Sequence, residues 1–221
     1  MKVQTQINNS TIRNPNSALP RSWRWVRLGE VCGINPRRPK SFNRPLNALT
    51  TFVPMAVVDE KTGTIARPEV VPYSKVSKGY TYFEENDVLF AKITPCMQNG
   101  KHVIARDLID GSGFGTTEFH VLRPNSNLLP EWIHFFIRQP YFLQEATAYF
   151  TGAVGQQRVP EEFLANYMIP LPLLLVQQRI ATELKEKMAE VEKLRTFIEK
   201  QLEAINDLPQ SILKKAFRGK L

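Results

Sequence analysis

The feature that most constrains this 221-residue chain is a long stretch near its C-terminal end that lacks proline and glycine. Fifteen of the sixteen prolines lie at or before Pro172, and Leu173 to Leu208 contains neither of the two residues that most disfavour helix. The stretch is rich in Leu, Glu, Lys, Ala and Gln, which favour helix. It predicts one long helix of about 33 residues, or roughly 50 Å. Pro209 then predicts the start of a short amphipathic helix that ends at Gly219.

Apolar residues recur along the predicted helix at steps of three or four, which indicates a single apolar face. The seven-residue spacing of Val191, Ile198 and Ile205 is typical of a coiled coil. So long a stripe cannot be buried against one small domain, and we expect a partner helix; the alternative is a helix folded back on its own domain. The predicted dimerisation residues are Ile180, Leu184, Met188, Val191, Leu194, Ile198, Leu202 and Ile205.

The first 172 residues predict a mixed α/β (α+β) domain, and residues 173–221 a separate helical region. The predicted strands are Phe52–Val58, Asp87–Ile93, His102–Ala105 and Thr117–Arg123, which are rich in Val, Ile and Phe. The predicted helices, each opened by a proline, are Pro130–Arg138, Pro140–Tyr149 and Pro160–Ala165. The polar segments between them predict long surface loops, where recognition usually takes place.

The formal charge of +8 is concentrated near the N-terminus. Residues 1–45 hold nine Lys or Arg and one acid, whereas residues 46–172 hold ten basic and thirteen acidic residues. A local excess of this size indicates a polyanionic partner, either nucleic acid or an anionic membrane surface. No run of 18 apolar residues and no apolar signal segment is present, so we expect a cytoplasmic protein.

Signs of catalysis are weak. The two cysteines form no CxxC pair, which argues against a disulfide framework or a cysteine-based zinc site. His120 and His134 lie among apolar neighbours and predict structural roles, while a Cys96–His102 pair would need a spatial contact that a sequence does not show. The run Gly111 to Gly115 lacks phosphate-loop spacing and predicts a flexible turn. We expect a chain without catalysis, metal or cofactor.

Two loops carry most of the predicted nucleic-acid contacts. Lys92, Thr94, Gln98, Asn99 and Lys101 offer groups that bond to base edges or phosphates, and an ordinary polar turn is the alternative. The second loop, residues 151–159, has two glycines that let the backbone approach a polyanion closely, and three polar side chains that can bond to bases or phosphates. Alternatively, Gln157 and Arg158 hold the loop by internal bonds. These side chains are Gln156, Gln157 and Arg158, and Thr116 is a further predicted DNA contact.

The basic N-terminal segment supplies a third set of predicted contacts. In residues 21–27 we expect Trp23 and Trp25 to cap the core, with the arginines facing solvent or phosphate. The alternative is that bases of a nucleic acid stack on the two tryptophans. A Pro- and Asn-rich loop follows. Its basic residues are expected either to hold backbone phosphates of DNA or simply to form a solvated surface. The basic residues concerned are Arg21, Arg24, Arg37, Arg38, Lys40 and Arg44.

The order of six motifs resembles the specificity subunits of type I restriction–modification enzymes, over nearly the whole chain. The motifs are LPRSWRWVRLGEV at 19–31, NDVLFAKITPCMQNGK at 86–101, GFGTTEFHVLRP at 113–124, TGAVGQQRVPEEF at 151–163, IPLPLLLVQQRI at 169–180 and LPQSILKKAFRGKL at 208–221.

The resemblance implies a target-recognition domain and a helical spacer that together direct a methyltransferase subunit, and a restriction subunit, to a bipartite site in double-stranded DNA. It implies no catalysis by this chain: the methyltransferase brings S-adenosylmethionine and methylates adenine, and the restriction subunit uses ATP. Family members usually carry two recognition domains and two helical regions, whereas this chain has one of each. We therefore expect a homodimer with antiparallel long helices that reads inverted half-sites; a fragment of a longer protein is the alternative. Without DNA recognition, the coiled coil alone would make the chain a structural interaction module.

Overall fold

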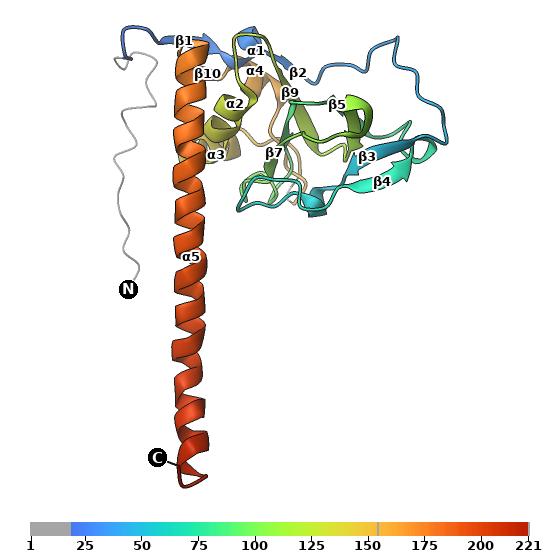
Figure 1. The fold of residues 1–221 in the computed structure, drawn as a ribbon. Helices are drawn as coiled ribbons and strands as arrows, with labels where there is room; N and C mark the ends of the chain where they lie inside the picture. The colour runs from blue at the N-terminus through green and yellow to red at the C-terminus, as the bar shows by residue number, and fades with distance from the viewer. Residues whose placement is uncertain (1–18, 154, 221) are drawn as a thin grey trace. The chain divides into compact units, whose positions relative to one another are not determined.

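The computed structural model describes residues 19–153 and 155–220 (Figure 1). The chain divides into two compact units between Gln177 and Gln178. Among the described residues, the first unit contains all the strands and four short helices, and the second contains most of the long helix α5 (Leu174–Ala216). The α+β fold class and the long C-terminal helix that the sequence predicted are thus confirmed.

The first unit is built on three sheets. The small antiparallel sheet pairs β1 (Arg24–Arg27) with β10 (Met168–Leu171). The second sheet is fully antiparallel, in the order β2 (Cys32–Ile34), β9 (Phe119–Pro124), β6 (Val88–Ala91) and β7 (His102–Ile104). The third has the order β4 (Glu69–Pro72), β3 (Leu49–Val53), β8 (Ser112–Gly115) and β5 (Thr81–Glu84), and only its β3–β8 pair is parallel.

The core lies where the two four-stranded sheets meet. All four residues of β6 are buried, as expected for a central strand covered on both faces. Leu89 of β6 and Phe119 of β9 pack with Val53 and Phe83 from the other sheet. The helices α1 (Leu28–Val31), α2 (Pro130–Ile137), α3 (Pro140–Ala148) and α4 (Glu161–Asn166) complete the unit, together with 3₁₀ turns at Met55–Val57, Tyr73–Lys75 and Ile109–Gly111.

The short helices confirm the proline signals, because α2 and α3 begin at Pro130 and Pro140, and α4 follows Pro160. Two predictions that concern the strands of the first unit are wrong. The strand predicted at Phe52–Val58 lies earlier, at Leu49–Val53, and the following Pro54 has no N–H to continue a ladder.

The second wrong prediction concerns the glycine-rich run, which is the buried strand β8 and not a flexible turn. The glycines are needed for packing: a Cβ on Gly113 would lie 2.6 Å from Cε2 of Phe83.

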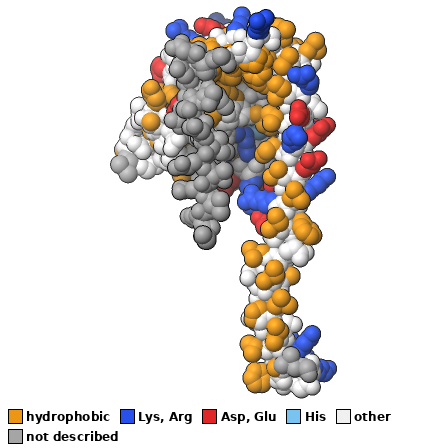
Figure 2. All heavy atoms as spheres, turned by 90° about the vertical axis from the view of Figure 1, so that its left-hand side faces the viewer, with side chains coloured by type: hydrophobic (Ala, Val, Ile, Leu, Met, Phe, Trp, Pro, Cys, Tyr) orange, Lys and Arg blue, Asp and Glu red, His pale blue; other side chains and the backbone are white. Residues whose placement is uncertain are grey.

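Helix α5 continues through Pro209, so the predicted separate C-terminal helix is wrong. A proline removes one backbone hydrogen bond and disfavours the helix, but here the strong helix formers on both sides continue through it. The apolar stripe is largely exposed along the helix (Figure 2), with Val191 at 56% and Ile198 at 62% of their maximal exposure. Among the described residues, no helix has the length and apolarity needed to cross a membrane.

Candidate nucleic-acid interface

The two loops that the sequence singled out lie side by side. The backbone N–H of Thr94 donates to the carbonyl of Gln157 at 3.0 Å, and the N–H of Val159 donates to the carbonyl of Lys92 at 3.0 Å. An antiparallel bridge between Ile93 and Arg158 lies between these two bonds. Segments about 60 residues apart in the chain thus form one continuous surface.

A third segment, the turn that precedes β9, joins this surface. The N–H of Lys92 donates to the carbonyl of Glu118 at 2.9 Å, and the hydroxyl of Thr116 accepts from the N–H of Glu118 at 3.3 Å. We call the combination of residues 92–101, 116–118 and 151–159 the recognition surface; Val154 within it is not described. It brings together Lys92, Thr94, Thr116 and the second loop, which the sequence placed in separate motifs.

A bidentate ion pair between Arg158 and Glu118 links two of these segments. Nε of Arg158 donates to Oε2 of Glu118 at 2.8 Å, and Nη2 donates to Oε1 at 2.7 Å. The hydrogen bonds from Arg158 hold the pKa of the Glu118 carboxyl below its usual value, and the nearby Lys92 ammonium acts in the same direction. Arg158 therefore does help to hold its loop internally, which was the alternative interpretation of this residue.

The first loop has an exposed tip. The Thr94 hydroxyl donates to Oε1 of Gln98 at 2.7 Å, and the side chains of Gln98 and Asn99 are exposed. Lys101 differs, because its ammonium donates to the carbonyl of Val58 at 3.1 Å. It also lies 3.8 Å from a carboxylate oxygen of Glu60. The structure thus commits Lys101 to internal contacts, while Gln98 and Asn99 remain presented to solvent.

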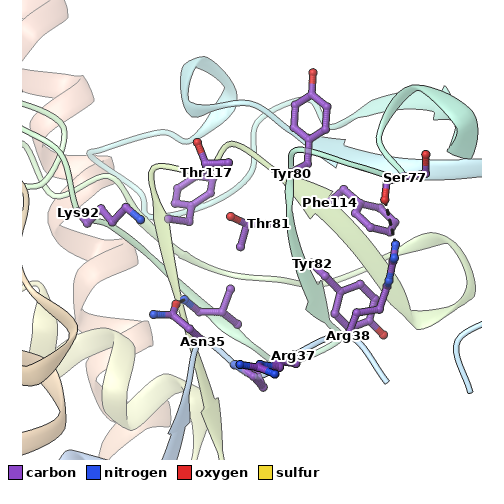
Figure 3. A pocket seen from close by; sticks show the side chains of 13 residues that line it. Asn35, Arg37, Arg38, Ser77, Tyr80, Thr81, Tyr82, Lys92, Phe114 and Thr117 are labelled. Atoms are coloured by element: carbon purple, nitrogen blue, oxygen red, sulfur yellow. Dashed lines mark hydrogen bonds between the residues drawn. The ribbon is translucent and has the colours of Figure 1, made fainter. Parts of the chain in front are cut away.

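A hollow of about 410 Å³ lies between the recognition surface and the Pro- and Asn-rich loop of residues 35–48, which we call the N-terminal loop (Figure 3). Arg37 and Arg38 from that loop line it together with Lys92 and Thr117. Arg38 is held in place, because its Nη1 donates to the Tyr73 hydroxyl at 2.8 Å and to the Ser77 carbonyl at 3.1 Å. Three predicted cations from two distant motifs therefore surround one concave site.

Asn35, which the sequence did not single out, ties the N-terminal loop to the second recognition loop. Its Nδ2 donates to Oε2 of Glu161 at 2.7 Å and bonds with Nδ1 of His120 at 2.9 Å. Nε2 of His120 lies 2.9 Å from the carbonyl of Val159. Because Nδ1 accepts from the amide of Asn35, the network assigns the His120 proton to Nε2, which donates to Val159. The backbone of Asn35 is left-handed (φ 49°), and this conformation cannot be read from the sequence.

The remaining predicted residues lie apart from this network. Arg21 and Arg24 are exposed beside and on β1, which pairs with β10, and Lys40 is exposed in the loop before β3. Trp23 and Trp25 are half-buried, and Trp23 packs edge-on against Trp132, in agreement with a cap on the core.

Arg44 is the clear exception among the basic residues of the N-terminal loop. It is buried, with Nη2 donating to the Ile109 carbonyl at 3.0 Å and lying 3.2 Å from the Asp110 carboxylate. The prediction of a phosphate clamp at Arg44 is therefore wrong.

The groups considered for catalysis have structural contacts. The His102 ring stacks on Phe90 with centroids 4.3 Å apart, and its Nδ1 accepts from the N–H of Ala91 at 3.1 Å. Cys96 packs against the apolar core, and no hydrogen bond joins it to His102. His120 and His134 are both buried and bonded to backbone carbonyls, which confirms their structural roles. Within residues 19–153 and 155–220, no three His, Cys, Asp or Glu side chains form a metal-binding group.

Comparisons with known proteins agree with the family resemblance. The model of the family described as "Type I restriction modification DNA specificity domain" matches residues 20–205. The EcoEI type I specificity subunit of Escherichia coli is 36% identical over 196 residues, covering 88% of this chain and 32% of the relative. The corresponding EcoAI subunit is 34% identical over 196 residues, covering 88% and 33%.

Two solved structures share the fold. A chain from work on complex assembly and conformational transition of the type I R-M system has a TM-score of 0.75 at 25% identity, covering 90% of this chain and 50% of its own length. The HsdS subunit from Thermoanaerobacter tengcongensis has a TM-score of 0.66 at 25% identity, covering 90% and 49%. The present chain spans about a third of the length of the curated relatives and about half that of the solved chains. The chain belongs to the family of type I restriction–modification DNA specificity domains.

Proposed function

We propose that the chain is the DNA-recognition component of a type I restriction–modification enzyme and binds double-stranded DNA sequence-specifically. The observation that carries this proposal is the convergence of three chain segments on one polar surface, flanked by a hollow lined by Arg37, Arg38 and Lys92. Cations that neutralise phosphates supply affinity, and hydrogen-bonding side chains beside them supply sequence preference. Family membership supports the same function.

In this proposal the residues divide by chemistry. Arg37, Arg38 and Lys92 contact phosphates from the hollow, while the exposed Gln98 and Asn99 reach base edges. Lys101 is left out of the direct contacts because internal carbonyls engage its ammonium. Residues 1–172 form the recognition domain and residues 173–221 the helical spacer.

The partners follow from the family. The curated relatives are subunits of type I restriction enzymes. By analogy, this chain directs a methyltransferase subunit that uses S-adenosylmethionine to methylate adenine, and a restriction subunit that uses ATP, in the cytoplasm. The chain itself carries out no catalysis and holds no cofactor.

Methylome sequencing of cells that carry the chain together with its methyltransferase subunit tests the function. The expected result is adenine methylation at one bipartite motif that disappears when the chain is removed. Binding of the complex to duplex DNA should also weaken steeply with salt, with a log–log slope near −4 to −5 for about five phosphate contacts. Unchanged methylation without the chain, or binding that does not respond to salt, would contradict the proposal.

The exposed stripe of α5 supports a homodimer in which two long helices pair in antiparallel orientation. A helix with exposed Val191, Leu194 and Ile198 gains stability by burying them against the same stripe of a second copy. A twofold arrangement of two recognition domains would read inverted half-sites at a fixed separation.

The double variant Val191→Lys with Ile198→Lys tests this seam. Lysines within a helix pair oppose its association, so the variant should have the mass of a monomer in light scattering. Ala189→Lys with Thr196→Lys is the matched control, because it introduces two lysines with the same spacing on the opposite side of the helix. The control should remain dimeric; an unchanged mass for the stripe variant would contradict the proposed seam.

A further inference from the structure

Arg158 is held unusually firmly for a residue on a surface loop. Its backbone N–H donates to the carbonyl of Thr151 at 2.9 Å, and its carbonyl accepts from the N–H of Thr151 at 3.0 Å. The bridge to Ile93 fixes the other side of the same residue. The side chain is then fixed by the bidentate pair with Glu118, yet 37% of it is exposed. A side chain fixed in this way loses little further conformational entropy when it binds.

The donors of Arg158 can be counted individually. A guanidinium has five N–H donors: one on Nε and two on each terminal nitrogen. Nε and Nη2 each donate once to Glu118, and Nη1 donates to the carbonyl of Gln156 at 2.6 Å. With respect to the described residues, one donor on Nη1 and one on Nη2 are left. A free donor on each of the two terminal nitrogens is what the fork that bonds to O6 and N7 of guanine in the major groove requires.

The charge of the pair distinguishes a base from a phosphate as its target. Glu118 is ionised at neutral pH, as a glutamate ordinarily is, and the hydrogen bonds from Arg158 lower its pKa further. The pair is therefore close to neutral, and a carboxylate beside the fork disfavours a phosphate, whereas the base edge of guanine is uncharged. Positive charge for phosphates is available nearby on Lys92, which lines the adjacent hollow.

We propose that Arg158 reads one guanine of the DNA target through its two remaining donors, and that Glu118 is the positioning residue that aims them. This inference rests on the proposed function and deepens it by naming a base and its reader. A carboxylate that supports a base-reading arginine fixes the plane of the guanidinium, which bidentate recognition requires.

Selection from a library of duplexes with a randomised 20-base-pair segment tests the inference. The full chain is used, alone and in complex with its methyltransferase subunit. The wild type should select a motif that includes a guanine. Arg158→Lys keeps the charge but loses the planar fork, so the preference for guanine at one position should fall by roughly 5- to 150-fold while the other positions are unchanged.

Glu118→Gln tests the positioning role. Its side chain accepts through one oxygen only, so the fork is no longer fixed and the same guanine preference should weaken. Affinity for unselected duplexes should stay the same or increase, because one negative charge is removed. A residue that only stabilises the fold would lower the preference at every position, and its effect would appear as reduced thermal stability in circular dichroism.

Arg106→Lys is the matched control, since Arg106 forms an exposed ion pair with Glu131 on helix α2, outside the recognition surface. It should select the wild-type motif. An unchanged guanine preference in Arg158→Lys, or a uniform loss of affinity for all sequences, overturns the guanine contact and leaves the proposed function intact. If the wild type selects no motif in either form, the proposed function itself fails.

Discussion

Two phenylalanines show how the two units of the chain differ. Phe90, on the central strand β6, is fully buried and packs against His102 and Phe142. Phe197, on helix α5, is 60% exposed. The first unit thus buries a core of apolar side chains internally, as an independently stable domain must. The second unit is a helix with a row of exposed apolar side chains, which the proposed homodimer would bury.

The largest expected effect contrasts these two residues directly. Phe90→Ala should lower the free energy of unfolding of the first unit by about 3–5 kcal/mol, because it removes contacts and leaves a cavity. Phe197→Ala, the matched change at an exposed position, should alter it by less than about 0.5 kcal/mol. Urea titration followed by tryptophan fluorescence measures both values, since all three tryptophans lie in the first unit. Equal losses would show that the units do not differ in this way.

Acidification should also separate the units, because all three histidines lie in the first. Burial lowers the pKa of His134 from 6.5 to about 4, so the folded state favours the neutral ring. This contribution to stability is complete above about pH 6.5 and is lost as the pH falls toward 4; the loss reaches about 2 kcal/mol at pH 5. Urea titrations at pH 7.5 and pH 5 measure it.

His134→Gln serves as the comparison for the acid effect. It should lose about 2 kcal/mol less than the wild type between pH 7.5 and pH 5. The same acid loss in both proteins would mean that His134 is not the responsible group.

A smaller effect tests the packing density of the first unit. Gly113→Ala places a methyl group 2.6 Å from the Phe83 ring, so it should cost about 1–3 kcal/mol of unfolding free energy. Gly33→Ala is the control, because its nearest neighbours lie at 3.8 Å and neither change requires a left-handed backbone. Thermal unfolding measures the two, and a destabilised Gly33→Ala with an unaffected Gly113→Ala would contradict the proposed packing.

The smallest effect belongs to the helix. Nε of Arg195 lies 3.3 Å from Oε1 of Glu199 one turn later, and both side chains are about half exposed. Glu199→Gln should reduce helix stability by only about 0.3–0.5 kcal/mol, because solvent screens exposed pairs. Far-ultraviolet circular dichroism during heating measures this difference, and a loss of several kcal/mol would show that the pair is not solvent-exposed in solution.

Prediction from the sequence succeeded where the signal is local. The three helices that follow prolines and the strand core Val88–Ala91 were found because capping and hydrophobic patterns depend on neighbouring residues. The strand at Ser112–Gly115 was missed, because its glycines indicate a turn unless the ring of Phe83 is known to pack on them.

The candidate site followed the same rule. Its two loops were predicted from their polar and glycine content, but the sequence does not show that they share a surface. Arg158 is paired with Glu118, 40 residues away in the chain, and His120 is bonded to Asn35, 85 residues away. Patterns among neighbouring residues therefore cannot predict these contacts. The internal bonds of Lys101 and Arg44 were missed for the same reason.

The sequence by itself determined that this protein combines an α+β domain with a long helix, and to which family it belongs. A stretch without proline or glycine specifies a long helix, and the ordered motifs specify the family, because both are properties of the linear chain. Only the tertiary structure decided which charges remain available for a partner. That depends on which distant carbonyls and carboxylates fold beside each cation, and these neighbours are set by the pairing of strands rather than by position in the sequence.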